Sequence, residues 1–313
     1  MRTNREEQMH EQLEALGQQI EMIRKRTEEK DEIQQIAGER ITLNTSVGMV
    51  KAAFYKAPKE QAPIVFYFHG GGFCYGGYCT EDQMFDTLRN QLGVNVVSVG
   101  YKINVKYPQA LMECYGAVCA MVQSEIYEFD RAQISLCGSS AGANLALAVA
   151  MLAWREEKRK KAVFRIRKLL LNYPCVDLAT PPEDKWEWND KELLQELYFA
   201  YAYADIQERT NPLVSPLYAE AEDFDPETRV LVILAENDGL NAEGKAIAKK
   251  LSDFGLYVEC YQAAGMPHGY YEFAFKPIEQ FLPPDVVNAA EDGSLDKMAR
   301  WATETIKLFF TER

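Results

Sequence analysis

The chain has 313 residues, and 47% of them are hydrophobic, which is enough to build the core of one large domain. Its formal net charge of −13 argues against nucleic acid or an anionic membrane surface as a partner, because both would repel an acidic protein. The N-terminal residues lack the apolar core of a signal peptide, and the longest apolar run, Leu145 to Trp154, is too short to span a bilayer. We therefore expect a cytoplasmic protein with no membrane span and no nucleic-acid partner.

The first predicted element is an amphipathic helix over residues 5–37. Its charged sequence carries apolar residues at spacings of three or four, which form a narrow stripe. These residues include Leu13, Leu16, Ile20 and Ile23. We expect the stripe to dock on another part of the chain.

After Gly38, short apolar runs alternate with segments of helix length. The clearest predicted strands are Ile64 to Phe68, Val94 to Val99, Ile134 to Cys137, Lys168 to Tyr173, Val230 to Ala235 and Tyr257 to Tyr261. The predicted helices are Glu81 to Gln91, Gln109 to Glu125, Ala141 to Arg159, Ala242 to Phe254 and a C-terminal helix ending near Phe310. Strands that are apolar on both faces and alternate with helices indicate a mostly parallel sheet covered on both sides, so the predicted class is α/β.

Residues 177–216 interrupt this alternation. The segment is rich in proline, acidic residues and aromatic residues, among them Trp186 and Trp188, and we interpret it as an inserted helical lobe. We expect a single domain over residues 1–313, in which residues 5–37 and 177–216 form a cap over the site. The alternative is that both segments only pack on the domain without covering anything.

The seven cysteines do not favour a disulfide framework, because their number is odd and the chain shows no secretion signal. Two pairs, Cys74 with Cys79 and Cys114 with Cys119, suggest zinc half-sites by spacing. However, Cys114 and Cys119 fall in a predicted helix, where five residues turn the second side chain about 140° away from the first. We expect reduced thiols, no metal site and no cofactor.

A candidate nucleophile lies in the sequence Gly138-Ser-Ser-Ala-Gly142, between a predicted buried strand and a predicted helix. This order is the context that a G-x-S-x-G turn needs, because glycines let the chain turn sharply and raise the Ser140 hydroxyl above the sheet. The N-terminus of the following helix stabilises developing negative charge. A bare G-x-S-x-G also occurs by chance, so the context carries the prediction.

The sequence His69-Gly-Gly-Gly-Phe73 directly follows a predicted strand. Consecutive glycines can bring backbone N–H groups up to an oxygen without obstruction, which is what a tetrahedral oxyanion requires. We expect the N–H groups of Gly71, Gly72 and Ala141 to be the donors, with His69 and Gly70 supporting the loop. A phosphate cradle is the weaker alternative, since neither G-x-G-x-x-G nor a P-loop lysine is present.

An acyl-transfer serine needs a base, and elimination among three histidines favours His268, because His10 lies in the N-terminal helix and His69 in the glycine loop. His268 lies in a turn after the last predicted strand. Asp238 follows another strand end and is the preferred acid. Glu236 is the competing carboxylate, and a purely helix-capping Asp238 is the structural alternative.

Together, these motifs resemble the hormone-sensitive-lipase-like branch of α/β-hydrolases, which includes bacterial esterases and acetyl esterases. The resemblance runs from about Pro63 to Phe273. It departs from the family pattern at three positions. The family usually has Asp where this chain has Ser139, Gly where it has Ala143, and Pro where it has Gly239.

The resemblance implies a serine carboxylesterase that acts on small-molecule esters with short to medium acyl chains, with Ser140, His268 and Asp238 as its triad. It also implies a helical cap and no metal, and it leaves a homodimer open. Two alternatives remain. One is an amidase, arylformamidase or peptidase that uses the same triad, and the other is a hydrolase-like protein that binds a ligand without turnover.

Overall fold

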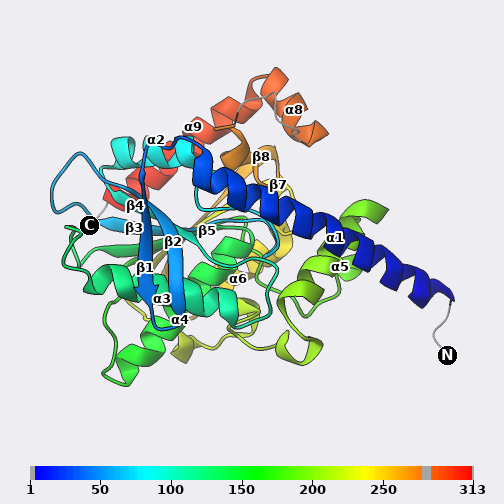
Figure 1. Ribbon diagram of the computed structural model, residues 1–313, viewed down its shortest axis with the longest axis horizontal. Helices are drawn as coiled ribbons and strands as arrows, with labels where there is room; N and C mark the ends of the chain where they lie inside the picture. The colour runs from blue at the N-terminus through cyan, green and yellow to red at the C-terminus, as the bar shows by residue number, and fades with distance from the viewer. Residues whose placement is uncertain (1–3, 277–282, 312–313) are drawn as a thin grey trace.

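An eight-stranded sheet lies at the centre of the computed structural model, which describes residues 4–276 and 283–311 (Figure 1). Its strands in chain order are β1 (Glu39–Thr45), β2 (Gly48–Tyr55), β3 (Ile64–Phe68), β4 (Asn95–Gly100), β5 (Ile134–Ser139), β6 (Lys168–Asn172), β7 (Arg229–Asn237) and β8 (Tyr257–Pro267). The spatial order is β1-β2-β4-β3-β5-β6-β7-β8. Only β2 runs antiparallel to its neighbours, so the predicted mostly parallel α/β sheet is confirmed.

Helices cover both faces of this sheet. They are α1 (Asn4–Ile33), α2 (Asp82–Leu92), α3 (Gln109–Gln123), α4 (Ala141–Lys158), α5 (Asp190–Tyr203), α6 (Asn241–Asp253), α7 (Tyr270–Phe273), α8 (Pro284–Glu291) and α9 (Ser294–Thr311). Alternate residues of β3 point to opposite faces, because side chains along a strand alternate. Phe66 packs in the cluster with α3, α4 and α6, whereas Tyr67 packs in the cluster with α2 and α9. This two-sided burial explains why β3 is apolar throughout.

The structure differs from the sequence-based prediction at the sheet edges. The hairpin of β1 and β2 was not among the strands we singled out, because its half-exposed residues give a weaker apolar signal. Strand β8 extends beyond Tyr261 to Pro267, since its pairing with β7 continues past an irregularity near Ala235. Helix α1 ends at Ile33 rather than at residue 37.

The interpretation of residues 177–216 as a helical lobe is only partly right. Within this segment, α5 is the one α-helix, and the remainder consists of 3-10 turns and irregular chain. Asn189 and Glu192 form a capping box at its start, which fixes where the helix begins. Ile20 of α1 packs with Tyr198 and Ala202 of α5, so the apolar stripe of α1 does dock, and Figure 1 shows the two helices side by side.

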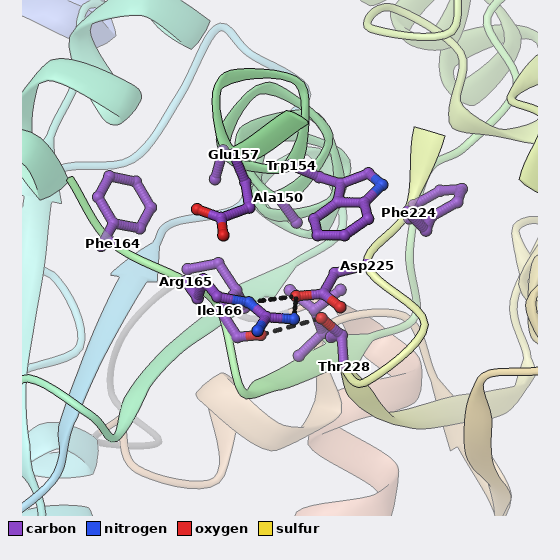
Figure 2. Close-up of a pocket in the computed structure, with 11 residues that line it drawn as sticks. Ala150, Trp154, Glu157, Phe164, Arg165, Ile166, Phe224, Asp225 and Thr228 are labelled. Atoms are coloured by element: carbon purple, nitrogen blue, oxygen red, sulfur yellow. Dashed lines mark hydrogen bonds and ion pairs between the residues drawn. The ribbon is translucent and has the colours of Figure 1, made fainter. Parts of the chain in front are cut away.

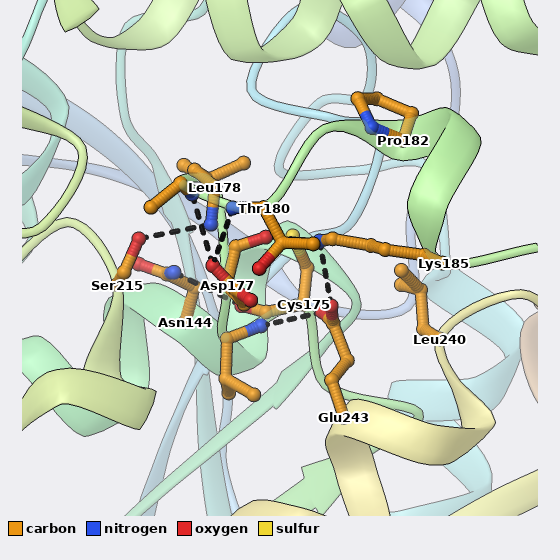
Figure 3. Close-up of polar contacts among 12 residues, drawn as sticks. Asn144, Cys175, Asp177, Leu178, Thr180, Pro182, Lys185, Ser215, Leu240 and Glu243 are labelled. Carbon is orange, nitrogen blue, oxygen red and sulfur yellow. Dashed lines mark hydrogen bonds and ion pairs between the residues drawn. The ribbon is translucent and has the colours of Figure 1, made fainter.

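Buried polar side chains of α4 and α6 hydrogen-bond to the chain in and next to the insertion (Figure 3). The amide of Asn144 on α4 donates to the carbonyls of Cys175 and Val214, at 2.9 and 2.8 Å. On α6, Glu243 accepts from the backbone N–H of Val176 at 2.8 Å and pairs with Lys185 at 2.7 Å. These contacts hold the chain just before the insertion and at two points within it, Lys185 and Val214.

We predict that Asn144→Ala lowers the free energy of unfolding by about 2 to 4 kcal/mol, because two buried carbonyl groups lose their donor. Urea titration followed by circular dichroism measures this change. Asn90→Ala is the matched control, since the Asn90 amide donates to a carbonyl in an exposed part of α2, and it should cost less than about 0.5 kcal/mol. Equal losses in the two variants would contradict the anchoring role of Asn144.

Candidate active site

A cavity of about 570 Å³ opens at the ends of β5, β7 and β8. Its lining includes all three candidate triad residues, Ser140, Asp238 and His268, together with the glycine loop and side chains of the insertion. Figure 2 shows a much smaller hollow beside α4, of about 10 Å³, beside which Arg165 and Asp225 form an ion pair of 2.6 Å. That hollow has room for about one water molecule and contains none of the predicted site residues.

Ser140 occupies a sharp turn between β5 and α4. Its backbone has φ 56° and ψ −120°, a combination that is rare for a residue with a side chain. The turn is possible because glycine stands two positions before and two positions after Ser140. A Cβ atom at Gly138 would overlap the carbonyl of Gly142, and one at Gly142 would overlap the carbonyl of Phe68. The tight turn leaves the Ser140 hydroxyl at the cavity, at the N-terminus of the 18-residue helix α4.

The structure brings His268 and Asp238 together. Nδ1 of His268 and Oδ2 of Asp238 are 2.8 Å apart, and the Asp238 side chain is 2% exposed whereas that of His268 is 41% exposed. The competing carboxylate of Glu236 is turned elsewhere and accepts a hydrogen bond from the N–H of Gly265 at 2.6 Å. Asp238 also accepts from the N–H of Leu240 at 2.9 Å, so it braces its own turn while it orients the imidazole.

The electrostatic surroundings of His268 favour the charged imidazole. Burial alone would lower the pKa of His268, but the charge of Asp238 and its hydrogen bond outweigh burial and raise the pKa to about 9. Glu196 and Glu272 act in the same direction. These surroundings therefore stabilise the imidazolium form of His268.

The glycine loop adopts backbone conformations that only glycine takes easily, with φ 107° at Gly71 and φ 56° at Gly72. Gly70 lies against Ser139 and Ser140, where a Cβ atom would be 3.0 Å from the carbonyl of Ser139. Within residues 4–276 and 283–311, no hydrogen bond uses the N–H of Gly71, Gly72 or Ala141. All three donors therefore remain free for an oxygen atom in the cavity.

His69 is buried beneath the loop and does not face the cavity. Its ring stacks on Tyr101 with centroids 4.1 Å apart, and its carbonyl accepts from the Tyr101 hydroxyl at 2.6 Å. Nδ1 lies 2.8 Å from the carbonyl of Gly70. Burial lowers the pKa of His69 to about 4, so the ring stays neutral at pH 7. These contacts suit a bracing residue.

Glu272 is a site residue that the sequence did not single out. It is 8% exposed and accepts hydrogen bonds from the hydroxyl groups of Ser139, Tyr67 and Tyr173, with Tyr67 at 3.2 Å. The Tyr173 ring in turn packs edge-on against His268, with centroids 4.9 Å apart. Ser139 was the one signal in the sequence that pointed to Glu272. The family usually has a carboxylate at position 139, and a serine there indicates that another residue provides the carboxylate.

Two aromatic residues of the insertion pack onto the glycine loop and onto the turn that carries Asp238. The Trp188 ring lies against Gly239 and the Phe199 ring lies against Gly72, so that a Cβ atom at either glycine would overlap the ring. The glycine after Asp238, where the family usually has proline, therefore makes room for Trp188. The insertion thus contacts both the acid turn and the glycine loop.

Candidate metal sites, membrane-spanning helices and disulfides are absent from residues 4–276 and 283–311. No group of three or more His, Cys, Asp or Glu side chains there could hold a metal ion. No helix in that part of the chain is both long and apolar enough to cross a membrane. All seven cysteines lie in the described part and are unpaired.

Comparisons with known proteins agree with this architecture. A sequence profile described as alpha/beta hydrolase fold matches residues 65–272. An arylesterase of Saccharolobus solfataricus is 29% identical over 213 residues, which cover 66% of this chain and 68% of that protein. A protein of Acanthamoeba polyphaga mimivirus, whose name places it among alpha/beta hydrolases, is 28% identical over 223 residues, which cover 69% of this chain but only 63% of that protein.

The solved structure of an esterase from Pyrobaculum calidifontis superimposes with a TM-score of 0.71 at 26% identity, covering 91% of this chain and 94% of that one. Because the profile matches more than half of the chain and the fold agrees over most of its length, the resemblance inferred from the motifs is confirmed. The chain belongs to the alpha/beta hydrolase fold family, in the hormone-sensitive-lipase-like branch.

Proposed function

We propose that the protein is a serine carboxylic ester hydrolase in which Ser140 is the nucleophile, His268 the general base and Asp238 the orienting acid. The main support is the 2.8 Å hydrogen bond between His268 and Asp238, beside the cavity that Ser140 also lines. The names of similar proteins, an arylesterase and an esterase among them, favour ester substrates.

In the acylation step, Oγ of Ser140 attacks the ester carbonyl carbon while His268 takes the hydroxyl proton. Because Nδ1 of His268 is hydrogen-bonded to Asp238, Nε2 is the nitrogen that accepts this proton. The carbonyl oxygen becomes an oxyanion, which the free N–H groups of Gly71, Gly72 and Ala141 stabilise. Collapse of the intermediate expels the alcohol, which receives the proton back from His268.

In the deacylation step, His268 takes a proton from a water molecule that attacks the acyl-enzyme. The same three N–H groups hold the second oxyanion, and the acid leaves when Ser140 recovers its proton. The cavity volume of about 570 Å³ falls in the range of small-ligand sites, which supports esters with short to medium acyl chains. Cap elements at residues 5–37 and 177–216 would then shield the reacting groups from solvent, since Trp188 and Phe199 pack on the loops that carry them.

Ser140→Ala should lower the turnover of p-nitrophenyl acetate by at least about 10⁴-fold, because the acyl-enzyme can no longer form. Steady-state rates on acetate, butyrate, octanoate and laurate esters should be highest for the two shorter chains in the wild type. Ser124→Ala, in an exposed loop remote from the cavity, is the control and should keep full activity. A folded wild type that hydrolyses none of these esters but cleaves p-nitroacetanilide would support the amidase alternative, and ligand binding without turnover would support the non-catalytic one.

The pH profile should reflect the raised pKa of His268. Only the neutral imidazole accepts the proton of Ser140, so kcat/KM falls as pH drops below that pKa. With the pKa of His268 near 9, kcat/KM for p-nitrophenyl acetate should still increase between pH 7 and 8 and level off only above about 9. Rates measured with Ser140→Ala are subtracted at each pH to remove spontaneous hydrolysis.

Asp238→Asn should move the midpoint of this profile to lower pH and reduce the plateau by about 10⁴-fold, because the imidazole loses both its charge partner and its fixed orientation. Glu236→Gln is the matched control, since it removes a carboxylate from the same turn that does not contact His268. A midpoint that stays in place in Asp238→Asn, or that moves equally in Glu236→Gln, would refute the assignment of Asp238.

Gly72→Pro should lower kcat by about 10²- to 10³-fold relative to Gly72→Ala, because only proline removes the N–H donor. Gly72→Ala keeps the N–H and places a Cβ atom against Phe199 at a positive φ, whereas proline removes the N–H and also fixes φ near about −65°, so Gly72→Ala controls for the Cβ contact alone. KM should differ little between the two variants, since the oxyanion exists only after attack. Equal kcat values would rule out this N–H group as a donor.

A further inference from the structure

The cavity is strongly acidic. Of the described residues that line it, six carry carboxylates, whereas Lys276 is the single lysine or arginine. Five of these carboxylates already have partners. They are Asp238 with His268, Glu81 with Lys276, Glu272 with three hydroxyl groups, Asp285 with the N–H of Val286, and Glu192 with the N–H of Asn189.

Glu196 is the sixth carboxylate, and it differs from the other five in its contacts. No hydrogen bond or ion pair to its side chain is found in residues 4–276 and 283–311, although it is half-buried and lines the cavity. Its charge acts on His268 and on Asp238, so it lies close to the triad. Partial burial raises the pKa of Glu196 to about 7, so a cation beside it would favour the charged carboxylate over the protonated acid.

Helix α5 explains why Glu196 faces this way. Glu192, Gln195, Glu196 and Phe199 all line the cavity, and their spacings of three, four and seven place them on one face of the helix. Docking of the adjacent side on α1, through Tyr198 and Ala202, fixes that orientation. The face of α5 that covers the triad therefore combines a free carboxylate with an aromatic ring.

Aromatic rings form much of the remaining wall. Trp186, Trp188, Phe199 and Tyr75 line the same cavity as Glu196. Aromatic ring faces attract cations, and tryptophan does so most strongly. A methylated ammonium group fits this cavity in two ways. Its positive charge pairs with the carboxylate of Glu196, and its apolar methyl groups pack against the aromatic rings.

We propose that this cavity selects esters that carry a quaternary ammonium group, with Glu196 as the counter-ion and the tryptophan and phenylalanine rings as the surrounding wall. This inference rests on the proposed ester hydrolysis and names its substrate class. The cationic ester enters with its charge beside Glu196, which brings its carbonyl group to Ser140 and the three N–H donors.

The experiment compares two esters of the same shape and different charge. In acetylcholine a nitrogen carries the three methyl groups, whereas in 3,3-dimethylbutyl acetate a neutral carbon carries them. Hydrolysis is followed by titrating the released acid at constant pH and ionic strength. We expect the wild type to prefer acetylcholine by at least about tenfold in kcat/KM, and Glu196→Gln to lose most of that preference.

Glu187→Gln is the matched control. Glu187 lies between the two tryptophans and carries the same charge, but it is exposed and does not line the cavity. The preference should persist in this variant. An equal loss in Glu187→Gln and Glu196→Gln would assign the effect to the overall negative charge of the protein and overturn the role of Glu196.

The remaining outcomes separate this inference from the proposed function. If both esters are hydrolysed at similar rates, the cation site is wrong and ester hydrolysis stands. If no ester is hydrolysed, the proposed function fails, and calorimetric titration with tetramethylammonium chloride still tests the site. Saturable binding that weakens at least about tenfold in Glu196→Gln would support the site, and equal or absent binding would overturn it.

Discussion

The close approach of three backbone segments at the ends of β3 and β5 is the constraint on which the rest of the site depends. Gly142 fits beneath the carbonyl of Phe68 only because it has no side chain, and Gly138 fits against Gly142 for the same reason. This contact forces Ser140 into its unusual backbone conformation and sets it beside the glycine loop that follows Phe68. Ser140 and the glycine loop are therefore positioned by one packing contact between backbones.

The departures from the family pattern become understandable when the groups around them are considered. Ser139 lacks a carboxylate, but its hydroxyl donates to Glu272, which brings a buried carboxylate to the same place from a distant part of the chain. Gly239 lacks the proline ring, and the space is taken by Trp188. In both cases a residue from a distant part of the sequence takes the place of the missing family group. The acidic, aromatic character of the cavity follows from these long-range partners.

The contacts of α5 connect the N-terminal helix with the chemistry proposed here. α1 packs on one side of α5, and the adjacent side of α5 presents Glu196 and Phe199 to the cavity. Buried polar contacts of Asn144 and Glu243 hold the chain on both sides of this helix. The charge of Glu196 also raises the pKa of His268, so the part of the protein that covers the site contributes to the basicity of its imidazole.

The sequence by itself determined the strands buried on both faces, the helices between them and the glycine motifs, because these depend on local periodicity and on backbone conformations that few residues allow. It also indicated Ser140, His268 and Asp238, since each follows the end of a strand in the chain order expected of this fold. Only the tertiary structure decided between Asp238 and Glu236 as the partner of His268, and only it revealed Glu272 and Glu196. Local patterns could not identify these carboxylates, because their roles depend on distances to residues far away in the sequence.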